Sequence, residues 1–274
     1  MSIGSQIAKR RKELGMTQES LAFSLGVSFQ AVSAWEREIY LPETDKLKDI
    51  AKILSTSAAW LLEEDALPPR WELHDEIFSI DRMYMQVKAA ANALGFVQTQ
   101  KALVLMENYH EGQVRKGKDK VPYIFHPLMI TCHALALGLK DDVLLSAALL
   151  HDVVEDCGVR AEDLDVSEPV REAVRLLSFS QGTDSREEAK EKYYAAMRDN
   201  KIAAMVKLLD RCNNISLMAM GFGKEKMADY IDETETKVFS LLNHVKHNYP
   251  EYYNAVFLLK YQMVSVMETL KRLL

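Results

Sequence analysis

The chain has 274 residues, 48% of them hydrophobic, and a formal net charge of −6 at pH 7. This length is typical of two domains, and the apolar content is enough to fill two cores. A negative net charge excludes a protein that covers nucleic acid with its whole surface, so any DNA contact must come from a local patch. Three cysteines without a CxxC pair, no secretory leader and no run of about 20 apolar residues predict a soluble, cytoplasmic protein.

The N-terminal part has the spacing of a small helical domain. Apolar periodicity predicts five helices, at residues 3–14, 18–25, 29–38, 44–54 and 57–62. Thr17 and Ser28 stand where N-caps are expected, and Gly26 ends the second helix. Two short helices joined by a tight, glycine-containing turn are a helix-turn-helix unit.

Three stretches carry a family resemblance: Thr17-Gln18-Glu19-Ser20-Leu21-Ala22, Gly26-Val27-Ser28 and Ala31-Val32-Ser33-Ala34-Trp35-Glu36. They resemble the Cro/C1-type (XRE) repressors, which implies a double-stranded DNA operator as partner and a symmetric homodimer. In that family Ala22, Val27, Val32 and Trp35 would lie in or near the core. The resemblance implies that Gln18 contacts phosphate and that the groove-facing residues are Ser28, Phe29, Gln30, Ser33 and Ala34.

The charge of this domain leaves an alternative open. Residues 1–70 hold nine Lys and Arg against ten Asp and Glu, which is low for a DNA-binding protein. A helical bundle that docks onto another protein therefore remains the second interpretation of this domain.

An acidic cluster followed by Leu67-Pro68-Pro69 breaks the helical pattern and predicts a domain boundary. We expect a DNA-binding domain at 1–66, a linker and connecting helix at 67–97, and a second domain at 98–274. The connecting helix is rich in methionine and is either a spacer or a dimer surface. No useful length of the chain alternates with period two, so the predicted fold class is all-α.

The second domain contains a dense group of ionisable residues. An apolar run at residues 144–150 ends in His151 and Asp152, and Glu155 and Asp156 follow. On one continuous helix His151 and Asp152 would point about 100° apart, which suits two ligands closing on one cation. Imidazole and carboxylate together fit a divalent Mn, Fe or Zn ion, and further ligands must come from elsewhere in the chain.

Two other stretches offer such ligands. His126 precedes Pro127, an order that favours an extended approach to a helix that starts at the proline. Asp210 and Asn214 are four residues apart, so they share one helix face.

The blocks Arg115-Lys116-Gly117, Pro122-Tyr123-Ile124-Phe125-His126-Pro127, Leu150-His151-Asp152-Val153-Val154-Glu155-Asp156 and Val206-Lys207-Leu208-Leu209-Asp210-Arg211-Cys212-Asn213-Asn214 follow in this order. They resemble the HD phosphohydrolases, and within these the hydrolase domain of RelA/SpoT-type alarmone enzymes. The resemblance implies Mn²⁺-dependent hydrolysis of the 3′-pyrophosphate of (p)ppGpp to GDP or GTP. It implies metal ligands at His126, His151, Asp152 and Asp210, a catalytic pair at Glu155 and Asp156, and substrate contacts from Arg115, Lys116 and Asn214.

Two departures from the family pattern stand out. The loop between Arg115 and Pro122 is about two residues longer than usual, and Cys157 replaces the usual threonine. Two alternatives stay open: a nucleotide-sensing regulator without turnover, and an HD hydrolase of another nucleotide such as NADPH, a cyclic dinucleotide or a dNTP. The Glu155-Asp156 pair favours turnover, because a sensor needs no groups that move protons. We expect His110 and His133 to lie at the surface.

Overall fold

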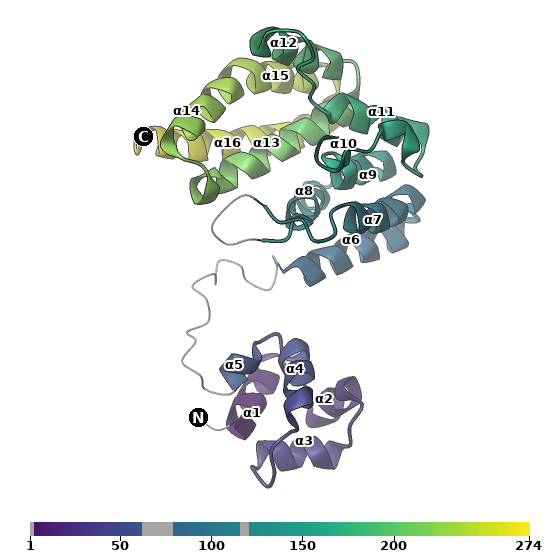
Figure 1. The fold of residues 1–274 in the computed structure, drawn as a ribbon, viewed down its shortest axis with the longest axis vertical. Coiled ribbons are helices and arrows are strands. Elements are labelled where there is room, and N and C mark those ends of the chain that lie inside the picture. The colour runs from purple at the N-terminus through teal and green to yellow at the C-terminus, as the bar shows by residue number, and fades with distance from the viewer. Residues whose placement is uncertain (1–2, 62–78, 116–120) are drawn as a thin grey trace. The chain divides into compact units, whose positions relative to one another are not determined.

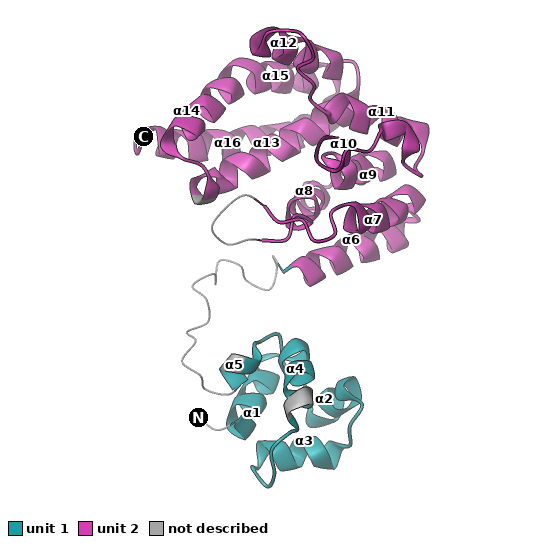
Figure 2. Ribbon diagram, viewed as in Figure 1, with its two compact units in different colours: residues 1–79 teal, residues 80–274 magenta. Residues whose placement is uncertain are grey.

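The computed structural model describes residues 3–61, 79–115 and 121–274, which are helical almost throughout (Figure 1). It divides into two compact units, Met1–Ser79 and Ile80–Leu274 (Figure 2). The predicted all-α class is confirmed, since the described ranges contain no strand and only an isolated antiparallel bridge between Val114 and Pro122.

The first unit has the five expected helices: α1 (Ile3–Glu13), α2 (Gln18–Leu25), α3 (Phe29–Glu36), α4 (Thr44–Ile53) and α5 (Ala58–Leu61). Both ends of α2 and the start of α3 are set by the predicted capping residues. The Thr17 side chain accepts a hydrogen bond from the backbone N–H of Ser20, and Ser28 does the same for Ala31. Gly26 adopts a left-handed φ of 64°, a conformation that glycine reaches without steric cost.

The core of the first unit forms where α1, α2, α3 and α4 turn their apolar faces inward. Ala22, Val32 and Trp35 are buried and Val27 is partly buried, in agreement with the sequence. Ile7 of α1 and Ile50 of α4 are fully buried in the same cluster.

The contact between α1 and α3 depends on a glycine. A Cβ atom added at Gly4 would lie 2.1 Å from the carbonyl oxygen of Trp35, a backbone atom that can move only with its helix. We expect Gly4→Ala to destabilise the first unit by about 1–3 kcal/mol through overpacking. Without this contact, alanine in a helix would instead stabilise the unit. Hydrogen exchange of α1 and α3 in the full chain measures the effect, with the exposed Lys9→Ala as control; slower exchange in Gly4→Ala would contradict the prediction.

The second unit is a larger helical bundle. Its helices are α6 (Ile80–Leu94), α7 (Val97–Tyr109), α8 (Phe125–Ala136), α9 (Asp142–Leu150), α10 (Val153–Cys157), α11 (Glu168–Leu177), α12 (Arg186–Met197), α13 (Lys201–Gly221), α14 (Lys224–Glu233), α15 (Phe239–Asn248) and α16 (Tyr253–Lys271). The long α13 packs against α8, α9, α11, α15 and α16, so it forms the middle of the bundle. No helix in the described ranges has the length and apolarity that crossing a bilayer requires.

Helix α6 belongs to the second unit. The sequence suggested that it connects the two domains, but it packs against α7 and α8 and buries Met83, Val87 and Ala91. Met85 remains exposed. The expected linker part at residues 67–78 lies outside the described residues.

The single continuous helix that was expected to carry both His151 and Asp152 is interrupted. Helix α9 ends at Leu150, α10 begins at Val153, and His151 and Asp152 form the corner between them. Residues 144–150 are all buried, so α9 is fixed on every side up to the corner. The two polar side chains are therefore presented by a turn and not by successive positions of one helix.

Candidate metal centre

Three elements of the second unit lie close together and carry the expected ligands: the start of α8, the corner between α9 and α10, and the middle of α13 (Figure 1). One ligand atom each from His126, His151 and Asp152 lies within 4.8 Å of the other two. The Asp152 Oδ2 atom is 3.0 Å from His151 Nε2 and 3.7 Å from His126 Nε2. The structure thus brings together three of the four expected ligands in one tight group.

Asp210, the fourth expected ligand, faces the same histidines from α13. Its Oδ1 atom lies 3.2 Å from His126 Nε2 and 3.9 Å from His151 Nε2. Burial opposes its ionisation, but the Lys207 ammonium and the two imidazoles hold the pKa of Asp210 well below its ordinary value. Asp210 therefore remains a carboxylate, the form that binds a cation.

Both histidines have one ring nitrogen engaged away from the centre. His126 Nδ1 lies 2.9 Å from Asn213 Oδ1, and His151 Nδ1 lies 2.8 Å from the carbonyl oxygen of Ala148. Since both acceptors require a proton on Nδ1, Nε2 is the nitrogen of each ring that faces the centre, and a cation bound there would displace any proton from it. The tautomer with its proton on Nδ1 is the one that a metal-binding imidazole needs here.

The donor set fits a divalent cation. His151 Nε2 is buried and has no hydrogen-bond partner among the described residues, although carboxylate oxygens lie close. Burial would lower the pKa of His151, but the Asp152 and Asp210 carboxylates raise it to about 9. Two imidazoles and two carboxylates are ligands for Mn, Fe or Zn, and four protein ligands leave room for water in a six-coordinate site.

The expected catalytic pair lies beside this centre at the start of α10. Glu155 and Asp156 are exposed, and Glu155 Oε2 accepts a hydrogen bond from the backbone N–H of Phe179 at 3.3 Å. Partial loss of hydration raises the pKa of Glu155 above its ordinary value, and the nearby Asp152 carboxylate adds to the effect. A carboxylate with a raised pKa is better suited to accept a proton.

Two of the three expected substrate-binding residues, Arg115 and Asn214, lie in contact with each other. Arg115 Nη2 donates to Asn214 Oδ1 at 3.1 Å, and Asn214 Nδ2 donates to Asp210 Oδ1 at 2.5 Å. Arg115 and Asn214 are therefore linked to the centre through Asp210. Lys116 and the longer loop lie outside the described residues.

Sequence reasoning missed three residues that contact the ligands: Lys207, Asn213 and Tyr123. Lys207 Nζ lies 3.0 Å from Asp210 Oδ2, and the Tyr123 hydroxyl donates to Asp152 Oδ2 at 2.6 Å. Lys207 was detectable as the residue one helical turn before Asp210. The contacts of Asn213 and Tyr123 depend on how the helices pack, so nothing in the local sequence indicated them.

The expectation for His110 was wrong. It is only 2% exposed, its Nδ1 atom lies 2.9 Å from Gln113 Oε1, and its ring stacks on that of Tyr123. His133 is half-buried, and loss of hydration lowers its pKa. The burial of both imidazoles depends on how the helices pack, which the local sequence does not indicate.

The predicted DNA-facing residues of the first unit are mostly accessible. Phe29 and Gln30 are exposed at the start of α3, Ser28 caps that helix, and Ser33 is half-buried. Ala34 is only 8% exposed and packs inward, which corrects the expectation that its side chain faces a groove.

Gln18 has an intramolecular partner at the start of α2. Its Nε2 atom donates to Glu36 Oε2 at 2.7 Å, and the buried Arg11 guanidinium pairs with the same carboxylate. Its expected phosphate contact stays a prediction.

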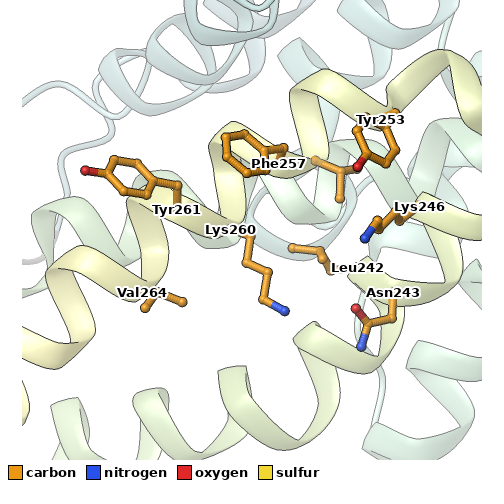
Figure 3. A pocket seen from close by; sticks show the side chains of 9 residues that line it. Leu242, Asn243, Lys246, Tyr253, Phe257, Lys260, Tyr261 and Val264 are labelled. Carbon is orange, nitrogen blue, oxygen red and sulfur yellow. The ribbon is translucent and has the colours of Figure 1, made fainter.

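A separate groove of about 250 Å³ lies between α15 and α16 (Figure 3). Its lining consists of apolar and aromatic side chains with two lysines and an asparagine: Leu242, Asn243, Lys246, Tyr253, Val256, Phe257, Lys260, Tyr261 and Val264. These described lining residues include no carboxylate or histidine. The groove thus lacks the groups for metal or proton chemistry that the centre contains.

The fold and the site define an all-α protein with a helix-turn-helix unit and a histidine–aspartate centre of the kind that holds a divalent metal. The helix-turn-helix family model matches residues 7–61. The chain is 34% identical over 153 residues to a GTP pyrophosphokinase of Streptomyces coelicolor, covering 54% of this chain and 18% of the relative. It is 38% identical over 120 residues to a guanosine-3′,5′-bis(diphosphate) 3′-pyrophosphohydrolase of Vibrio cholerae, covering 41% of this chain and 17% of that relative.

One solved structure, of a protein described as a metazoan ortholog of SpoT that hydrolyzes ppGpp, shares the fold. It superimposes with a TM-score of 0.52 at 23% sequence identity, over 63% of this chain and 95% of that chain. The chain spans only 17–18% of the length of the curated relatives named above. The chain therefore carries a helix-turn-helix domain over residues 7–61 and is similar, over part of its length, to a guanosine-3′,5′-bis(diphosphate) 3′-pyrophosphohydrolase and to SpoT.

Proposed function

We propose that this chain is a Mn²⁺-dependent hydrolase that removes the 3′-pyrophosphate of (p)ppGpp, and that its helix-turn-helix domain couples this activity to an operator in double-stranded DNA. The observation that carries the proposal is the meeting of His126, His151, Asp152 and Asp210 within a few ångströms, with Glu155 and Asp156 at the edge. A structural metal site would more commonly use four cysteine or histidine ligands and leave no such acid pair beside it.

The residues of the centre would have different roles in the reaction. A divalent cation held there would lower the pKa of a bound water and offset the charge that develops on phosphoryl oxygens. Glu155, with its raised pKa, would take up the proton from the attacking water, and Asp156 would orient that water. Lys207, 3.0 Å from Asp210, keeps that ligand ionised and adds positive charge near the substrate phosphates.

The substrate follows from the groups around the centre. Arg115 presents a planar guanidinium that can stack on a purine and hydrogen-bond to phosphate. Its contact with Asn214, which in turn contacts Asp210, aligns a base-binding group with the metal ligands. The relatives named for the guanosine 3′-pyrophosphate support guanosine as the nucleoside. Lys116 would supply a second cation there.

The first unit would supply the DNA contact. Ser28, Phe29, Gln30 and Ser33 lie at or near the start of α3, the end of a recognition helix that reads base edges. We expect the protein to act as a homodimer, because helix-turn-helix proteins commonly bind palindromic operators as dimers with the same two-fold symmetry. Selection of bound duplexes from a random library tests this part. If no sequence is enriched, the result would favour a domain that docks onto another protein.

The decisive experiment measures release of pyrophosphate and GDP from ppGpp by the purified full chain with Mn²⁺, beside a variant with His151→Ala and Asp152→Ala. We expect release that requires the metal and is absent in the variant. Tight nucleotide binding without release would support a nucleotide-sensing regulator. Hydrolysis of NADPH, a cyclic dinucleotide or a dNTP, without hydrolysis of ppGpp, would assign the centre to another substrate.

A further inference from the structure

The Tyr123 hydroxyl contacts the metal centre directly. It donates to Asp152 Oδ2 at 2.6 Å, and this is the carboxylate oxygen that faces both His151 Nε2 and His126 Nε2. A carboxylate at a helix corner can rotate about its side-chain bonds, so a hydrogen bond to one oxygen restricts the direction of both.

The Tyr123 ring is held by a second aromatic ring. It stacks on the His110 imidazole with 4.5 Å between ring centroids and 20° between ring planes. His110 is buried at the end of α7, and its Nδ1 atom is 2.9 Å from Gln113 Oε1, which fixes the plane of the imidazole. The backbone N–H of Tyr123 donates to the carbonyl oxygen of Gln113 at 2.9 Å, so the three residues form one connected support.

The composition of this support indicates more than space filling. His110 Nε2 is buried without a hydrogen-bond partner among the described residues, an arrangement that costs free energy. An aliphatic side chain would fill the space without that cost. What the imidazole adds is a flat face in a fixed orientation, and that face contacts the residue whose hydroxyl reaches Asp152.

We infer that Tyr123 is a positioning residue of the metal centre, and that His110 acts on the centre through the ring of Tyr123. The inference rests on the proposed function in one respect only: the cation is that of the proposed hydrolase. Residues that hydrogen-bond to metal ligands commonly change metal affinity 10–100-fold when they are replaced. Tyr123 is placed to have this effect on Asp152.

The test uses the full chain and Mn²⁺ alone, titrated by calorimetry without any nucleotide. Tyr123→Phe keeps the stacked ring and removes the hydroxyl, and we expect about 10–100-fold weaker Mn²⁺ binding with an unchanged melting temperature in the absence of metal. Tyr109→Phe is the matched control, because this half-buried tyrosine lies at the end of the same helix as His110. We expect the control to bind Mn²⁺ like the original chain.

The role of His110 is tested by two replacements. His110→Phe keeps a flat ring against Tyr123 and should retain most of the Mn²⁺ affinity, whereas His110→Ala removes the stack and should weaken it as Tyr123→Phe does. If His110→Ala fails to fold, His110→Leu, which fills the space without a flat face, should reproduce the loss. Equal affinity of His110→Phe and His110→Leu would overturn the part assigned to His110.

Failure of this inference differs from failure of the proposed function. A chain that binds Mn²⁺ and hydrolyses ppGpp, but whose Tyr123→Phe variant binds Mn²⁺ equally well, overturns only the inference. A chain whose Mn²⁺ affinity falls in Tyr123→Phe as expected, but which releases no pyrophosphate from ppGpp, overturns only the proposed function. No Mn²⁺ affinity in the original chain overturns both.

Discussion

Asp210→Asn is expected to reduce pyrophosphate release from ppGpp by at least about 10³-fold and to weaken Mn²⁺ binding. Metal chemistry of this kind contributes several kcal/mol to the transition state, and each 1.36 kcal/mol is a tenfold change in rate. Asp210 lies 3.2 Å from His126 Nε2 and is held ionised by Lys207, so the neutral amide removes one anionic ligand from a buried site. Initial rates over a Mn²⁺ series measure both effects.

The control for this variant is Asp199→Asn, the same chemical change at an exposed position just before α13. It should leave turnover and Mn²⁺ affinity unchanged. Asn214 and Lys207 contact Asp210, so near-ultraviolet circular dichroism should confirm that the variant keeps its packing. Undiminished turnover in Asp210→Asn would remove Asp210 from the set of metal ligands.

Arg211→Met is expected to lower the free energy of unfolding of the second unit by about 3–5 kcal/mol, the usual cost of removing one partner from a buried ion pair. Arg211 is 3% exposed, its Nη2 atom lies 2.6 Å from Glu233 Oε1, and its guanidinium lies 3.8 Å from the centre of the Tyr230 ring. Urea unfolding followed by far-ultraviolet circular dichroism measures the loss. As a control, Arg160→Met removes an exposed ion pair with Asp163 and should leave the urea midpoint of unfolding unchanged.

The pH dependence gives an independent check on the same pair. Burial opposes the ionisation of Glu233, but Arg211 and Lys190 lower its pKa to about 2 from an ordinary 4.5. This carboxylate therefore stabilises the fold above pH 4.5, and the contribution is lost as the pH falls toward 2. In Arg211→Met this dependence should be weaker; an equally steep loss of stability would show that other carboxylates cause it.

The first unit was predictable because its signals are local. Thr17, Ser28 and Gly26 act on the backbone within a few residues, and the apolar spacing of five short helices directly gives the buried face. The error at Ala34 is of a different kind. A small side chain fits both a groove-facing and a core position, and only the packing of α3 decides between them.

The sequence indicated the candidate ligands of the centre but not the residues that contact them. His126, His151, Asp152 and Asp210 lie in recognisable blocks, and the structure brings them together. The break after Leu150 was missed because residues 144–150 are all buried and mostly apolar, so this stretch itself does not mark where α9 ends. The burial of His110 was missed for a related reason: its partners, Gln113 and Tyr123, follow it in loops whose path depends on the rest of the bundle.

The candidate ligands of the centre come from α8, the corner after α9, and α13, segments that are far apart along the chain. A cation bound by all of them would restrain the bundle much as a covalent cross-link does, because the unfolded chain offers no assembled site. Metal supply would then govern how long the second unit survives in the cell as well as how fast it turns over substrate. The helix-turn-helix unit, with its separate core, would not depend on the metal in this way.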